Sequence, residues 1–197
     1  MLITLDFECY WDTKVSLTKL TTTEYVKHPL FKVQGVGIKI DHEKTEWFNE
    51  DEAEEAVRSI DWSEATLIAH NTPFDGFILT RYYGVIPSYY IDTAAMARAL
   101  APGLGASLKQ CAIRQWPDDE SMRKGDELIN TKGIYDLTPE EDEILGGYCI
   151  QDVELTHGLY TQMCTQMPTS EMDLINITCR MFCEPKLVAD TEALIKF

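Results

Sequence analysis

Four carboxylates and one phenol stand in three separate segments of this sequence, and together they could perform one kind of chemistry. Asp6 and Glu8 lie in "LDFE", Asp75 ends "NTPFD", and Tyr148 and Asp152 lie in "YCIQD". A donor set made of oxygen atoms favours Mg²⁺ or Mn²⁺ over Zn²⁺. Such a cluster can hold two divalent cations about 4 Å apart, which stabilise the attacking and leaving oxygens of a phosphodiester.

The first pair of acids lies in a segment with the character of a buried strand. "LITLDF", residues 2–7, is rich in apolar and β-branched side chains. Side chains alternate along a strand, so Asp6 and Glu8 point to one face while Phe7 and Cys9 point to the other. Two like charges on one face repel, and a divalent cation would remove that repulsion. An exposed polar strand end is the alternative interpretation.

Asp75 falls in the first turn of an expected helix that follows the short apolar strand "ATLIAH". An acid in a first turn is stabilised by the helix dipole alone, and Asn71 could equally serve as a helix cap. The position nevertheless lies at a strand-to-helix turn, where α/β sheets place their chemistry. The location therefore favours a functional role for Asp75 over a purely structural one.

Two glycines precede the last acidic segment. Gly146 and Gly147 stand inside an expected long helix, where each costs about 1 kcal/mol relative to alanine. Tyr148 and Asp152 share one face of that helix. We infer that the glycines let the helix approach the sheet, or a bound ligand, more closely than side chains would allow. A tyrosine packed on the core beside a surface aspartate is the alternative.

The elements that must position these residues alternate between strands and helices. We expect a loop and short helix within 9–32, a polar loop over 117–137, and a long helix opened by Thr138, Pro139 and Glu141. Asn49 with Glu52, and Ser107 with Gln110, form patterns that cap further helices. The expected strands cover residues 2–7, 32–40, 44–49, 65–70 and 89–92. This order predicts an α/β fold with a mixed sheet flanked by helices.

Composition limits the class of protein. The chain has 197 residues, of which 45% are hydrophobic, and this suits one domain with a full core. No apolar run approaches the roughly 20 residues of a membrane span, and no signal peptide opens the chain, so we expect a cytoplasmic protein without membrane contact. Six scattered cysteines suit free thiols in a reducing compartment.

The formal net charge is −16, from 33 acidic and 17 basic residues. That balance argues against a protein that coats nucleic acid by charge alone. It leaves a local, metal-assisted contact with nucleic acid, or an acidic surface that itself mimics nucleic acid. Arg123, Lys124 and Lys132 lie in the 117–137 loop and are candidates for contact with a strand, although a solvated loop would look the same.

The three acidic segments, in this order, resemble the three exonuclease motifs of the DEDD superfamily. A tyrosine in the third motif is typical of the DEDDy branch, and the nearest likeness is to the proofreading 3′→5′ exonuclease domain of bacteriophage polymerase I-type (family A) DNA polymerases. "IDTAAMARAL" and "SLKQCA" are similar to the middle of such domains. The resemblance implies a ribonuclease H-like fold with a mixed five-stranded sheet flanked by helices.

The resemblance also implies a cofactor of two divalent cations, Mg²⁺ or Mn²⁺. Asp6, Glu8 and Asp152 would ligate the first ion, and Asp6 would bridge to the second. Asp75 would hold the second ion directly or through water. In the same family, Tyr148 would orient the water that attacks the phosphodiester.

For the substrate, the resemblance implies the 3′ end of single-stranded or frayed DNA, with Asn71 and Phe74 near the terminal nucleotide and a nucleoside 5′-monophosphate as product. "TCRMFCEPKLVADTEALI" resembles the lead-in from an exonuclease to a polymerase domain. We therefore expect residues 1–185 to form the exonuclease domain and residues 186–197 to begin a connection to a C-terminal polymerase domain of a longer chain. A phage-encoded protein of this kind would act in the host cell cytoplasm.

Two other functions compete with DNA proofreading. An RNA-processing exonuclease of the same superfamily would share the chemistry and differ in its contact with the sugar. A non-enzymatic acidic protein that mimics DNA would explain the net charge but would need no particular placement of its carboxylates.

Overall fold

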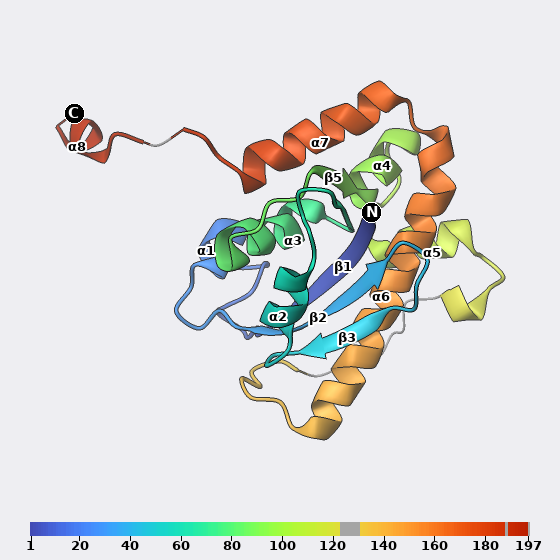
Figure 1. Ribbon diagram of the computed structural model, residues 1–197, viewed down its shortest axis with the longest axis horizontal. Helices are drawn as coiled ribbons and strands as arrows, with labels where there is room; N and C mark the ends of the chain where they lie inside the picture. The colour runs from blue at the N-terminus through green and yellow to red at the C-terminus, as the bar shows by residue number, and fades with distance from the viewer. Residues whose placement is uncertain (123–130, 188, 197) are drawn as a thin grey trace.

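One mixed sheet with the strand order β3-β2-β1-β4-β5 forms the centre of the fold. The computed structural model describes residues 1–122, 131–187 and 189–196, and Figure 1 shows the sheet with helices packed around it. The strands are β1 (Leu2–Cys9), β2 (Val33–Ile40), β3 (Glu46–Asn49), β4 (Thr66–Ala69) and β5 (Tyr89–Asp92). The expected α/β fold with a mixed five-stranded sheet is confirmed.

β1 is the central strand and pairs in both directions. It runs antiparallel to β2 and parallel to β4, while β3 is antiparallel to β2 and β5 is parallel to β4. β2 and β3 form a hairpin, and Asp41 opens its turn with a φ of 46°. The Asp41 carboxylate accepts a hydrogen bond from the main-chain N–H of Leu2 at 2.7 Å, which ties this turn to the start of β1.

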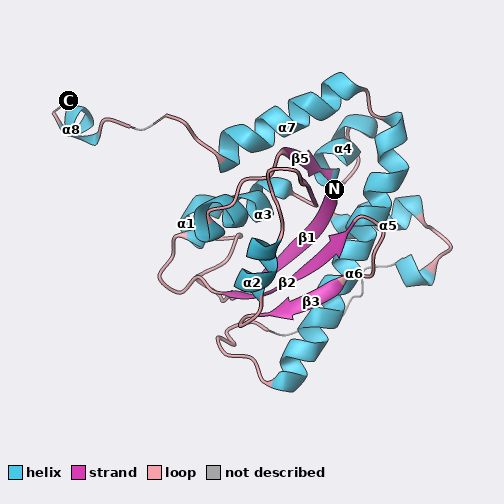
Figure 2. Cartoon of the chain, in the orientation of Figure 1, coloured by secondary structure: helices cyan, strands magenta, loops and turns pink. Residues whose placement is uncertain are grey.

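The helices follow the predicted order, and Figure 2 distinguishes them from the strands. A π-helical turn, η1 (Leu79–Tyr83), extends α3, and short 3₁₀ turns lie at Glu120–Met122 and Cys164–Gln166. The helices are α1 (Thr22–Val26), α2 (Ala53–Ser59), α3 (Thr72–Ile78), α4 (Thr93–Leu100), α5 (Leu108–Gln115), α6 (Pro139–Met163), α7 (Thr169–Cys183) and α8 (Thr191–Ile195).

Local sequence signals set several helix starts. Thr138 and Glu141 form a capping box at α6, as predicted, and Ser107 with Gln110 does the same at α5. The Asn49–Glu52 pattern acts differently from the prediction. Asn49 Oδ1 accepts from the main-chain N–H of Glu52, which closes a turn just ahead of α2, and the helix itself has no side-chain cap.

Two layers of helices enclose the sheet. On one face, α6 packs against β1, β2, β3 and β4, and α4 and α5 pack against α6. On the opposite face, α3 and η1 cover β1, where Phe7 stacks on Tyr83 with ring centroids 5.7 Å apart. α7 lies along β5 at the edge of the sheet (Figure 1). Because Asp6 and Glu8 alternate with Phe7, the two acids face the α6 layer.

The C-terminal α8 lies apart from the sheet and its helices in Figure 1. Arg123 and Lys124, two of the expected contacts to nucleic acid, fall outside the described residues. Within the described parts of the chain, no helix has both the length and the apolar character that crossing a membrane requires.

Candidate active site

The acids of β1 lie opposite two glycines of β2. Asp6 pairs with Gly37, and Glu8 pairs with Gly35, in the antiparallel register. The cross-strand neighbours of both acids therefore lack side chains, which leaves room above β2 for groups from other elements. The register shifts between Glu8 and Cys9, an irregularity of the kind that often lies beside functional sites.

α6 fills part of that room with Cys149. Its Sγ donates to the main-chain oxygen of Asp6 at 3.3 Å and lies 3.8 Å from Asp6 Oδ2. Potential ligand atoms of Asp6, Glu8 and Cys149 all lie within 4.8 Å of one another. Burial, and then the charges of Asp6 and Glu8, raise the pKa of the Cys149 thiol well above its usual value, so the group stays protonated.

Sequence reasoning missed Cys149 because it treated the cysteines as scattered thiols. All six are free in the structure. The signal that could have found Cys149 is its spacing: it follows Tyr148 and stands three residues before Asp152, on the face of α6 that meets the sheet. Asp152 itself is 4% exposed, so the predicted acid of this helix is buried and is not a surface aspartate.

Asp75 joins the site from the opposite layer. It lies in the first turn of α3, is 1% exposed, and its Oδ1 accepts a hydrogen bond from the main-chain N–H of Phe7 at 3.1 Å. Burial is the main cause that raises the pKa of this carboxyl well above its ordinary value, and the charge of Asp6 adds to it. Asp75 is therefore tied to β1 inside the fold, and its predicted functional role stays a prediction.

A further buried acid, Asp92, supports this end of the sheet. It is 2% exposed, and its Oδ1 accepts from the main-chain N–H groups of Asn71 at 2.8 Å and Ala94 at 3.0 Å. Its Oδ2 lies 3.5 Å from Arg98. Asp92 thus caps α4 and anchors the start of α3. Its place directly before a helix is a capping signal that sequence reasoning overlooked.

The two residues expected near a terminal nucleotide have different surroundings. Asn71 is exposed, has a φ of 74°, and makes no side-chain capping bond at α3, so its amide is not used as the cap that the sequence allowed. Phe74 is half-buried, and its ring centroid lies 6.1 Å from that of Tyr25. Tyr25 lies on α1, so Phe74 packs partly against that helix.

The two glycines before Tyr148 have separate roles. A Cβ added at Gly146 would lie 2.6 Å from Cδ1 of Trp47, so Gly146 does permit close packing of α6 against β3. Gly147 is exposed, and apart from its chain neighbours and the nearby backbone of α6 no described atom lies within 4 Å of a Cβ added there. Close approach to the sheet is therefore confirmed for Gly146 and wrong for Gly147, while close approach of a bound ligand at Gly147 stays a prediction. Tyr148 follows them half-buried, one turn before Asp152.

The donor set fits divalent cations. Asp6, Glu8, Asp75 and Asp152 are half-buried or buried, and withdrawing several carboxylates from water is costly unless they are paired or bind a metal. Carboxylate oxygens are the ligands that Mg²⁺ and Mn²⁺ prefer, and the protonated thiol of Cys149 packs beside them as a neighbour. These four acids would hold the ions.

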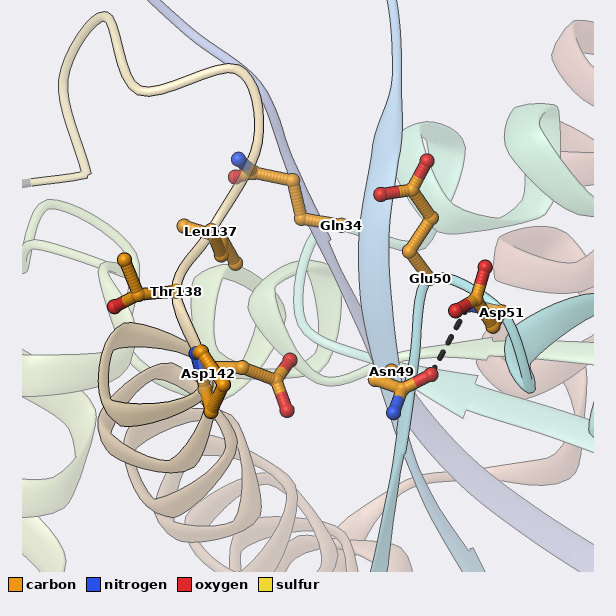
Figure 3. A pocket seen from close by; sticks show the side chains of 8 residues that line it. Gln34, Asn49, Glu50, Asp51, Leu137, Thr138 and Asp142 are labelled. Atoms are coloured by element: carbon orange, nitrogen blue, oxygen red, sulfur yellow. Dashed lines mark hydrogen bonds between the residues drawn. The ribbon is translucent and has the colours of Figure 1, made fainter.

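A separate hollow of about 320 Å³ lies where the beginning of β2 and the end of β3 meet the start of α6, as Figure 3 shows. None of the four site carboxylates lines it. Its walls carry Glu50, Asp51 and Asp142 together with Gln34 and Thr138. Since its lining is acidic, this hollow is unsuited to a phosphate backbone.

No protein-family model matches this chain, and no curated protein matches its sequence. Solved structures do match. Trypanosoma brucei RNase D aligns with a TM-score of 0.69 at 15% identity, over 95% of this chain and 67% of that one. The same protein in complex with RNA U12 aligns with a TM-score of 0.64 at 14% identity, over 95% of this chain and 65% of that one.

Escherichia coli RNase D, described as an exoribonuclease involved in structured RNA processing, aligns with a TM-score of 0.64 at 14% identity. The alignment covers 100% of this chain and 50% of that one, so this chain spans between about half and two thirds of the chains in these three structures. At such identities the likeness establishes the fold, which is the ribonuclease H-like fold of these exonucleases.

Proposed function

We propose that this chain is a metal-dependent 3′→5′ exonuclease that removes nucleotides from a single-stranded or frayed 3′ end and releases nucleoside 5′-monophosphates. The observation that carries this proposal is the convergence of acids from three elements. Asp6 and Glu8 come from β1, Asp75 reaches the main chain of β1 from α3, and Asp152 is buried on the helix that covers Asp6. The ribonuclease H-like fold supports the same chemistry.

We assign each residue of the site a separate role in the reaction. When bound, two divalent cations supply positive charge for the phosphodiester and lower the pKa of the attacking water. Asp6, Glu8 and Asp152 would bind the ions from the side that faces α6, and Asp75, oriented by the N–H of Phe7, would bind from α3. The hydroxyl of Tyr148 positions the water by hydrogen bonding.

RNA is the substrate class that we place first. The neighbours that support it are two RNase D proteins, one of them solved with RNA. DNA comes second, because the motifs and residues 178–195 resemble phage polymerase I-type proofreading domains. In that case residues 1–185 would be the exonuclease domain and residues 186–197 would lead to a C-terminal polymerase domain. Either enzyme would suit the cytoplasm, where six free thiols stay reduced.

An acidic mimic of nucleic acid is the non-enzymatic alternative. A mimic must display its charges at the surface. Asp75 and Asp152 are only 1% and 4% exposed, so they contribute nothing to such a surface. Their burial beside other acids instead suits a site that gathers cations.

The test is incubation with 5′-labelled single-stranded RNA and DNA of the same base sequence, with Mg²⁺, Mn²⁺ or a chelator. We expect a ladder of products shortened from the 3′ end that requires a divalent cation, and faster shortening of RNA. Faster shortening of DNA would reverse the order of the two substrates. Unchanged activity in chelator, or no cleavage of either strand, would refute the proposed enzyme.

A further inference from the structure

Beyond Glu8 the chain continues from β1 into a patch of two aromatic rings and a lysine, formed by Trp11, Lys132 and Tyr135 and here named the rim patch. Lys132 Nζ lies 5.8 Å from the centroid of the Trp11 ring, within the range of a cation–π contact. Trp11 Nε1 donates to Thr131 Oγ1 at 3.2 Å, and Gly133 N donates to Trp11 O at 2.8 Å. These bonds hold the 131–133 segment against the chain that leaves β1.

Tyr135 is the more open ring of the rim patch. It is 40% exposed, and its edge-to-face contact with Tyr10 has a centroid distance of 5.1 Å. Lys32 holds Tyr135 in place through two contacts. Lys32 Nζ lies 4.6 Å from the ring centroid and donates to the main-chain oxygen of Tyr135 at 2.9 Å. The charge of Lys32 is balanced by Glu50 and Asp136, each 2.7 Å away, so it is poorly placed to attract a phosphate. Lys132 is exposed and can serve that purpose.

The rim patch lies close to the acids. Trp11 follows Glu8 by three residues, so their Cα atoms are at most about 11 Å apart. Tyr135 contacts Tyr10 in the same stretch of chain, so both rings are within reach of the nucleotides that flank a phosphate bound at the acids. The acidic hollow of Figure 3 is lined by Leu137 and Thr138, which follow Tyr135 in the chain. Its carboxylates, Glu50, Asp51 and Asp142, would repel the phosphate backbone of the nucleic acid.

We propose that the rim patch binds the nucleotides next to the reacting phosphate of a single-stranded nucleic acid. Tyr135 and Trp11 offer surfaces on which bases stack, and Lys132 pairs with a phosphate. Such a patch would also fit the composition, because a chain with a net charge of −16 must bind a polyanion through a few local contacts. The inference rests on the proposed exonuclease, because it places the strand at the same acids.

The experiment measures binding of fluorescein-labelled oligo(U) and oligo(dT) by anisotropy in chelator, where the strand is not cut. Tyr135→Leu should weaken binding by about 10- to 100-fold, the range found for one base-stacking ring. Lys132→Met should weaken binding and reduce the slope of log affinity against log salt by about 0.7, the value of one phosphate contact on a single strand. In cleavage assays with metal, both variants should raise KM and leave kcat nearly unchanged.

Phe182→Leu and Lys186→Met are the matched controls. Phe182 lies on α7, and its 39% exposure matches the 40% of Tyr135. Equal binding by the test and control variants would overturn the rim patch, and so would a loss of kcat and melting temperature without a change in affinity. Binding that depends on Tyr135, without any cleavage in metal, would support the rim patch and refute the exonuclease. Cleavage with an unchanged KM in Tyr135→Leu would support the exonuclease and refute the rim patch.

Discussion

Adjacent glycines on α6 allow a matched pair of substitutions, Gly146→Ala and Gly147→Ala. Both add one methyl group to the same helix, and both should gain about 1 kcal/mol of helix propensity. Only the first meets an obstacle, because its Cβ would lie 2.6 Å from Cδ1 and 2.7 Å from Cγ of Trp47. Trp47 cannot retreat easily, since a Cβ at Gly35 would already lie 2.2 Å from the far edge of the same ring.

The magnitudes follow from these contacts. Gly147→Ala should raise the free energy of unfolding by up to about 1 kcal/mol, because the new atom meets no described atom of another element within 4 Å. Gly146→Ala carries in addition an overpacking cost of about 1–3 kcal/mol, so it should be neutral to destabilising by about 2 kcal/mol. The propensity gain cancels in the difference between the variants. At about 2–4 °C per kcal/mol for a chain of this size, their melting temperatures should differ by about 2–12 °C.

Thermal melts followed by circular dichroism in chelator measure this difference without any contribution from bound cations. The cleavage assay then shows whether the open space at Gly147 is used. A substrate that passes over this position should lose affinity in Gly147→Ala, although the protein itself is more stable. If Gly146→Ala melts at or above Gly147→Ala, α6 is not in close contact with Trp47, and the account of the two glycines is wrong.

Four further predictions follow from the site and its surroundings. Asp152→Asn should lower kcat/KM by about 10³-fold or more in the ladder assay because it removes a cation ligand, and a variant that keeps a tenth of the activity would show that the ligand is misassigned. Tyr148→Phe should lower kcat by about 10- to 100-fold, as loss of one positioning hydrogen bond predicts, while calorimetry finds Mn²⁺ affinity unchanged; a wild-type rate would mean that the ring serves packing alone. Mg²⁺ should raise the melting temperature of the wild type but much less that of Asp6→Ala, since the ion relieves repulsion among the acids, and equal shifts would argue against binding at Asp6. Burial, and then the charge of Lys39, lower the pKa of His157 below its ordinary 6.5, so the folded state favours the neutral ring. The contribution of the neutral His157 ring to stability should be fully present above pH 6.5 and should be lost as the pH falls through the lower pKa of the folded state. His157→Gln should lose this acid dependence in thermal melts across the same pH range.

Much of the fold could be read from patterns that involve neighbouring residues. Alternation along residues 2–9 predicts that Asp6 and Glu8 share a face, because the period of a strand is a local property. Thr138 with Glu141 predicts the start of α6 because a capping box closes within one turn. The order of strands and helices follows from the same short-range signals, which is why the mixed sheet was predicted correctly.

Other features depend on contacts between distant parts of the chain. Helical spacing shows that Cys149 and Asp152 share a face, but only the packing of α6 on β1 brings the thiol to 3.3 Å from the main-chain oxygen of Asp6, 143 residues away in sequence. Likewise, composition cannot show that Gly146 contacts Trp47 while its neighbour Gly147 lies at the surface.

The sequence by itself determined the identity and order of the acids, the faces on which most of them lie, and the elements that carry them. Only the tertiary structure decided that Asp75 is buried and bonded to the N–H of Phe7, that Cys149 joins the acids, and that Thr131 and Tyr135 pack against Trp11 and Tyr10 just beyond β1. The physical reason is the distance along the chain over which each effect acts. Propensity, alternation and capping act over a few residues, whereas burial and the meeting of side chains from separate elements depend on how the layers pack around β1.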